Sequence, residues 1–158
     1  MPDSLSSPTL LLTLERLDKT DGKALLKSSV KELIARGVLR IEAREEQRRL
    51  RRSRQRLLLV DGPQPPPPDR TLAGVARMIA GAPSEVSEGR VVRDLAEVAK
   101  HLARQPDVRK VVVGSALSEL AAAGLVATGE RRVFGLVKRT VHTRTPAGET
   151  VLEEATGR

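Results

Sequence analysis

The sequence predicts a mainly α-helical fold with small β-hairpins, in which two helix–hairpin units of winged-helix type form a single compact domain. Three observations lead to this prediction. Residues 107–145 have the pattern of a helix followed by a hairpin, and residues 28–42 repeat part of that pattern. The chain has 158 residues and is 39% hydrophobic, which is enough for one packed core.

The stretch 107–145 carries the clearest pattern. Asp107 is expected to cap a helix by accepting a free backbone N–H of its first turn. Gly124 is expected to end that helix, because glycine enters the left-handed conformation without a Cβ penalty. Leu125-Val126 and residues 133–137 then indicate two strands, with a turn at Gly129-Glu130. Five apolar residues at helical spacing predict the buried stripe of the helix: Val113, Ala116, Leu117, Leu120 and Ala121.

Residues 28–42 form a weaker copy of this stretch. In both segments a glycine that would end a helix precedes a branched apolar pair. This agreement indicates a shared structural plan. The identical residues are Ser28, Glu32, Leu33, Ala35 and Gly37, which match Ser115, Glu119, Leu120, Ala122 and Gly124.

The first part of the chain is read from turn residues and from the spacing of leucines. Residues 1–8 are expected to be a disordered lead, and residues 9–17 a short helix. Residues 18–23 have the composition of a turn. A second helix follows, and residues 38–41 are expected to form a strand. The second helix is marked by Leu26, Val30, Leu33 and Ile34.

An arginine-rich segment, residues 44–56, precedes a returning strand at residues 57–60. It fits either a protruding hairpin or a helical arm. It also fits either a solvated loop or a contact to phosphate, for which arginine offers bidentate hydrogen bonds. The proline-rich residues 62–68 are expected to form a stiff spacer between a lobe at 9–61 and a lobe at 69–158.

The second lobe is expected to contain three helices. The first runs from Asp69 or Thr71 to Ala80 and is stopped by Gly81. The second ends before Pro106 and is marked by Val91, Leu95, Val98 and Leu102. After the stretch at 107–145, Thr145-Pro146 predicts the start of a short final helix, with threonine as the cap and proline at the first position.

Composition and charge narrow the function. The net charge of +8 and the isoelectric point near 10.7 favour an anionic partner, either nucleic acid or an acidic membrane surface. Phe134 is the only aromatic residue, which disfavours single-strand binding by base stacking. The absence of cysteine is consistent with a reducing cytoplasm, and residues 1–7 do not resemble a signal peptide. Glu119 interrupts the longest weakly charged run, so we expect any membrane contact to be peripheral.

The sequence contains no recognisable catalytic pattern. His101 and His142 lack metal-ligand spacing, and neither is accompanied by a cluster of carboxylates. The glycine patterns of nucleotide-binding loops and of serine hydrolases are missing. We therefore expect a non-enzymatic protein without a metal or cofactor.

The order of several short motifs resembles a known family. A leucine-rich helix precedes Glu32-Leu33 and Gly37, and the basic hairpin follows. Residues 69–72 then form the Asp-x-x-Leu motif at the start of a helix, and residues 107–109 form the Asp-Val-Arg motif at the start of another. The last motifs are Gly135-Leu136 and residues 139–142. In order and spacing, residues 10–145 resemble the Golgi phosphoprotein 3 family, in a prokaryotic-type form that is short at its C-terminus.

This resemblance implies a mainly helical domain that binds phosphatidylinositol 4-phosphate at a membrane surface through a basic site. The site of the family uses a tryptophan and several arginines, whereas this chain has no tryptophan. One family arginine falls on Leu26, with Lys27 beside it. The others fall on Arg109 and Lys110 if that helix has an extra turn, and otherwise on Lys110, Val113 and Ser115.

These observations favour a cytoplasmic, peripheral membrane protein that binds anionic phospholipid with a phosphoinositide-like head group. The expected anion-binding residues are Lys27, Arg48, Arg49, Arg51, Arg52, Arg109, Lys110 and Arg139. Self-association through the 44–56 hairpin is a further expectation.

The alternative is a winged-helix DNA-binding regulator. Residues 145–152 resemble a sequence that is common in such regulators, Thr-Pro-Ala-Gly-Glu-Thr-Val-Leu. Its recognition helix, residues 111–123, has no Arg, Lys, Asn or Gln with which to contact base edges. DNA would therefore be held through its phosphates by hairpin cations. These cations are Arg131, Arg132, Lys138 and Arg139.

Overall fold

A computed structural model describes residues 7–46, 54–133, 135 and 137–157. The helices found there are α1 (Pro8–Glu15), α2 (Gly22–Ala35), α3 (Arg70–Ala80), α4 (Leu95–Ala103), α5 (Val108–Ala122) and α6 (Pro146–Thr156), with a 3-10 turn η2 (Leu17–Lys19). The strands are β1 (Leu39–Glu46), β2 (Arg54–Asp61), β3 (Glu85–Ser87), β4 (Arg90–Asp94), β5 (Val126–Val133) and β6 (Val137–Arg144).

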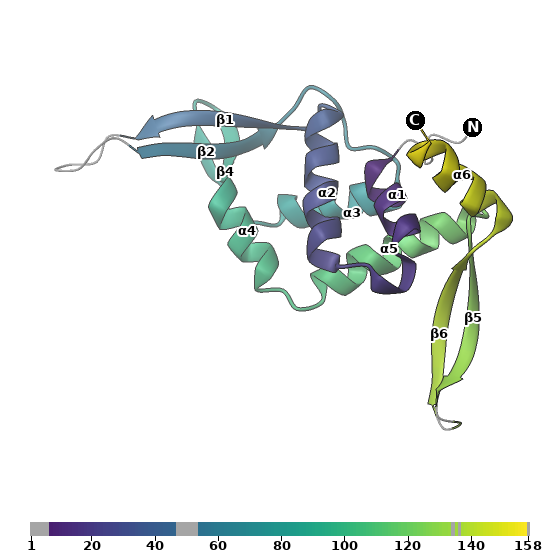
Figure 1. Cartoon of the computed structure of the whole chain (residues 1–158). Helices are drawn as coiled ribbons and strands as arrows, with labels where there is room; N and C mark the ends of the chain where they lie inside the picture. Colours follow the sequence, from purple (N-terminus) through teal and green to yellow (C-terminus); the bar gives the residue numbers. More distant parts are fainter. Residues whose placement is uncertain (1–6, 47–53, 134, 136, 158) are drawn as a thin grey trace.

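The fold is mixed α/β rather than mainly α with small hairpins. Strands β1, β2, β4 and β3 form one antiparallel sheet in that order, and β5 and β6 form a separate hairpin. Figure 1 shows β1–β2 projecting from one end of the helices and β5–β6 from the other. In its described part the 44–56 segment belongs to a hairpin, not to a helical arm.

The sheet is larger than expected because β3 and β4 were not predicted. Val91, which was assigned to a helix, lies in β4 opposite Val86, and α4 begins only at Leu95. The turn between the two strands consists of Glu88 and Gly89, both with positive φ (54° and 75°). Two successive residues with positive φ are typical of a tight hairpin turn.

Three paired positions connect β2 to β4: Leu58 with Asp94, Leu59 with Arg93 and Val60 with Val92. Residues 62–68 contain no helix or strand. They are tied back to the end of α2, because the Gly62 and Gln64 N–H groups donate to the carbonyls of Val38 and Gly37. Segments on both sides of these prolines therefore share one sheet.

The core lies around α2, which packs against α1, α3 and α5 (Figure 1). The fully buried side chains there are Leu14, Leu25, Leu33, Leu72, Val75, Val112 and Leu120. Helix α5 buries two of the five predicted residues, Ala116 and Leu120. The side chain of Ala121 is exposed, and Val113 and Leu117 are half-buried. The buried residues recur every four positions instead, at Val108, Val112, Ala116 and Leu120.

The predicted glycine stops of α2 and α5 are confirmed. Gly37 and Gly124 adopt φ values of 78° and 76°. The residue after each glycine donates its N–H back to a carbonyl in the last turn of the helix. Val38 N–H donates to the Leu33 carbonyl, and Leu125 N–H donates to the Leu120 carbonyl, both at 3.0 Å. This pairing is the Schellman motif that a left-handed glycine permits.

The helix starts are only partly as predicted. Thr145 caps α6, as expected, by accepting from Gly148 N–H. Asp107 occupies the cap position of α5 but makes no side-chain capping bond. The predicted lead at residues 1–8 is wrong for its last two residues, because buried Ser7 caps α1 and Pro8 is its first residue. Residues 1–6 lie outside the described part.

The hairpin turn predicted at Gly129-Glu130 is also wrong. Gly129 and Glu130 lie inside β5, where they face Val141 and Thr140 of β6. The strands continue to Val133 and Val137, so the hairpin is several residues longer than predicted.

The two segments that share sequence also share a contact. Glu32 of α2 accepts from Thr9 N–H at 3.1 Å. Glu119, its counterpart in α5, accepts from Thr71 N–H. Thr9 and Thr71 are each the second residue of a helix, α1 and α3. Each glutamate therefore satisfies a free N–H at the start of another helix.

Candidate functional site

A groove lies between α2 and α4, with strands β1 and β2 at one end and the start of α5 at the other. Its volume is about 360 Å³. We call it the α2–α4 groove. Its apolar lining consists of Leu26, Val30, Ile34, Ile41, Leu59, Leu95, Val98, Ala99, Leu102 and Ala103, and its polar lining of Lys23, Lys27, Lys31 and Arg109.

The spacing of residues along α2 gives the groove both an apolar wall and a cationic edge. Lys23, Lys27 and Lys31 follow one another at intervals of four, so they form one exposed file along the helix. Leu26, Val30 and Ile34 form a neighbouring file at the same interval and are half-buried. Helix α2 therefore supplies both an apolar wall and a cationic margin.

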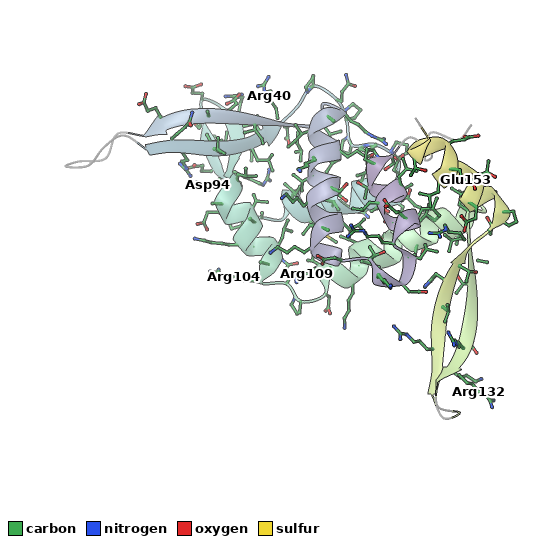
Figure 2. The ribbon with its side chains drawn as sticks, in the orientation of Figure 1. Arg40, Asp94, Arg104, Arg109, Arg132 and Glu153 are labelled. Atoms are coloured by element: carbon green, nitrogen blue, oxygen red, sulfur yellow. The ribbon has the colours of Figure 1, made fainter. Side chains whose placement is uncertain are left out.

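Arg109 reaches the groove because α5 begins very close to the start of α2. A Cβ placed on Gly22 would lie 2.6 Å from Cβ of Arg109 and 3.0 Å from its carbonyl oxygen. Glycine at position 22 therefore permits an approach that any other residue would block. Figure 2 labels Arg109 at the beginning of α5, beside the first turn of α2.

The cations of the groove have no neutralising partners within the described ranges. Lys23, Lys27, Lys31 and Arg109 make no ion pair there with a carboxylate within 4.0 Å. The lining carries no acidic residue, so the formal charge of its side chains is +4.

Arg56 and Arg90 of the sheet differ, because carboxylates neutralise them. Arg56 donates to Asp94 at 2.7 Å, which lowers the pKa of Asp94 below its ordinary value and raises that of Arg56. Arg90 donates to both carboxylate oxygens of Glu42, and these hydrogen bonds lower the pKa of Glu42. A basic composition alone therefore does not locate the cationic surface.

An exposed apolar strip continues from the groove onto the β1–β2 hairpin. Ile41 lines the groove and is 41% exposed, and Leu57 is 43% exposed. Ile41 and Ala43 share one face of β1, and Ala43 lies opposite Leu57 in β2. The strip leads towards the tip of the hairpin, which lies outside the described residues.

The structure brings together only some of the predicted site residues. Lys27 and Arg109 both line the groove, whereas Lys110 is exposed on α5 outside its lining. Arg139 lies on β6, which belongs to the hairpin at the other end of the molecule (Figure 1). The four remaining residues lie outside the described part: Arg48, Arg49, Arg51 and Arg52.

Lys23 and Lys31 were not predicted. The signal was present, because both lie four residues from Lys27 on the same helix. The apolar wall from α4 had no comparable signal, since only the tertiary fold places α4 opposite α2.

A second cationic surface lies on the β5–β6 hairpin. Arg131 faces Arg139 across the strands, and Arg132 faces Lys138. Lys138 has an ion pair with Glu130 at 3.8 Å, and in the described chain the three arginines have none. Figure 2 places Arg132 near the far end of the hairpin. Like charges directly opposite each other destabilise a hairpin, so these facing cations lower the folding stability of the free protein.

Among the residues described, no three acidic or histidine side chains gather as metal ligands. No helix in these ranges has the length and apolar character needed to cross a bilayer. Comparison with family models, curated proteins and solved structures finds no match for the chain.

Proposed function

We propose that this protein is a peripheral membrane protein that binds anionic phospholipid through the α2–α4 groove. One observation carries the proposal: every polar side chain that lines this apolar groove is a cation without a carboxylate partner in the described chain. Near an anionic bilayer each lysine or arginine contributes about 1 kcal/mol to binding. Exposed Ile41 and Leu57 would add contact with the interface.

The head group is proposed to be phosphoinositide-like, in keeping with the resemblance to the Golgi phosphoprotein 3 family. Leu26, on which one family arginine falls, and Lys27 beside it both line the groove. Arg109, which the resemblance reaches if its helix has an extra turn, lines it as well. A phosphate monoester carries up to two negative charges and offers several acceptor oxygens to lysine and arginine. We infer membership of this family as part of the same proposal.

Flotation with lipid vesicles tests the function. At physiological ionic strength the protein is expected to float with phosphatidylcholine vesicles that contain phosphatidylserine, and more strongly at matched charge with phosphatidylinositol 4-phosphate. K27Q/K31Q should weaken partitioning by roughly 25-fold, about fivefold per lysine. The matched control K19Q/K138Q removes the same charge outside the groove. Protein that stays at the bottom of the gradient with every vesicle would refute the proposal.

A second candidate function is duplex DNA binding by the β5–β6 hairpin, as in a winged-helix regulator. The observation that favours it is the pair of facing cations, Arg131 with Arg139 and Arg132 with Lys138. Such a surface would contact phosphates rather than base edges. An electrophoretic shift with duplex DNA should then fall steeply with salt and be lost in R131Q/R139Q. A shift that K27Q/K31Q abolishes instead would place DNA at the groove.

A further inference from the structure

We propose that the α2–α4 groove encloses one acyl chain of the bound anionic phospholipid, and not the head group alone. The inference rests on the proposed function for the class of ligand. It goes further in one respect, because it requires a chain to leave the bilayer and enter the protein.

The distribution of residues along the groove matches an amphiphile. At the α5 end lie Lys23, in the first turn of α2, and Arg109, in the first turn of α5. Lys27 and Lys31 continue this cationic margin along α2, and the sheet end of the lining contains the apolar Ile34, Ile41 and Leu59. An anionic head group is thus matched at the α5 end and along the margin, and a hydrocarbon chain is matched by the apolar lining.

The size of the groove is that of a small-molecule site. Its volume of about 360 Å³ lies within the range of ligand sites, roughly 300–1,000 Å³. Apart from its four cations the lining is apolar, so it suits hydrocarbon better than the polar backbone of a peptide.

The sheet end also provides a route from the membrane. Ile41 belongs both to the groove lining and to the exposed apolar strip with Ala43 and Leu57. If this strip rests on the bilayer, the chain passes along it and reaches the apolar lining at the sheet end of the groove. The head group is then lifted towards Lys23 and Arg109.

A tryptophan reporter tests this inference in solution, because the chain has no Trp or Tyr of its own. A99W places the reporter in the groove, and A147W places a control on exposed α6. Dioctanoyl phosphatidylserine is added below its critical micelle concentration, with no bilayer present. We expect a saturable change in A99W fluorescence and none in A147W. Glycerophosphoserine, which has the head group without chains, should give no change.

Two filling substitutions, V30F and A103F, are then added separately to A99W. Each should abolish the saturable response to dioctanoyl phosphatidylserine, because the added ring occupies the space that the acyl chain would enter. Circular dichroism shows whether each variant is folded. If one variant is not folded, the response of the other variant tests the inference. The inference is overturned if A99W shows no saturable fluorescence response, or if glycerophosphoserine gives the same response. It is also overturned if V30F and A103F are folded and leave the response unchanged. Loss of flotation by the wild-type chain would instead contradict the proposed function.

Discussion

Glu32 and Glu119 occupy equivalent positions in α2 and α5, and each accepts a backbone N–H from the second residue of another helix. The donors are Thr9 and Thr71, both buried. Glu32 is 5% exposed and is held further by Ser7 Oγ at 2.6 Å and by Arg36 at 2.7 Å. The repeated plan seen in the sequence therefore extends to a contact between helices.

Replacing either glutamate by alanine is expected to destabilise the protein. E119A leaves the Thr71 N–H without its acceptor, which costs about 1–3 kcal/mol of unfolding free energy. E32A should cost more, because Ser7 and Arg36 also lose their partner. Urea unfolding measures both. E119Q keeps an acceptor oxygen and serves as the control, so equal losses in E119A and E119Q would contradict the capping role.

The close approach of α2 and α5 gives a second prediction. G22A places a methyl group 2.6 Å from Cβ of Arg109 and must displace the start of α5. We expect a loss of about 1–3 kcal/mol in stability and weaker flotation with anionic vesicles. Gly114, a helical glycine with open space around it, supplies the control. G114A should gain up to about 1 kcal/mol, measured by urea unfolding.

Acid should weaken the protein through Asp94. Because Arg56 lowers the pKa of Asp94 in the folded state, the carboxylate stabilises the fold above its unfolded pKa of about 3.9. That stabilisation is lost as the pH falls through the lower, folded pKa. The difference in Tm between wild type and D94N should therefore shrink below about pH 4. A difference that is constant from neutral to acidic pH would show that the ion pair does not contribute.

The facing cations of the β5–β6 hairpin predict a gain in stability when one is reversed. R139E places a carboxylate opposite Arg131 and should stabilise the protein by roughly 0.2–1 kcal/mol at low salt. The gain should shrink as salt is added, because both positions are exposed. Thermal unfolding over a salt series provides the measurement. T140E, which adds a carboxylate opposite Glu130, should have the opposite sign.

Much of the fold was predictable from local signals. Gly37 and Gly124 identified the helix ends because only glycine adopts positive φ there without strain. Thr145-Pro146 identified α6 for an equally local reason. The short strands β3 and β4 were missed because Val91 and Leu95 also have helical spacing, while the glycine of their turn follows Glu88 rather than Asn or Asp.

The candidate site was less predictable than the fold. Lys27 and Arg109 were predicted as site residues. However, Arg109 reaches the groove through the close approach of α5 to Gly22, which no pattern in the sequence indicates. The arginines of the sheet contributed to the charge argument, yet Arg56 and Arg90 are neutralised by residues 38 and 48 positions away in sequence. Net charge therefore predicts an anionic partner, but it does not predict where the cationic surface lies.

The three paired positions between β2 and β4 have a consequence for a chain cut within residues 62–68. The first fragment would hold β1, β2, α1 and α2, and the second would hold the remaining strands and helices. Neither fragment has a complete interior, because α2 packs against both α3 and α5. A protease that cleaves among these prolines should thus leave a nicked molecule whose halves stay together, and separated halves should regain structure only on mixing.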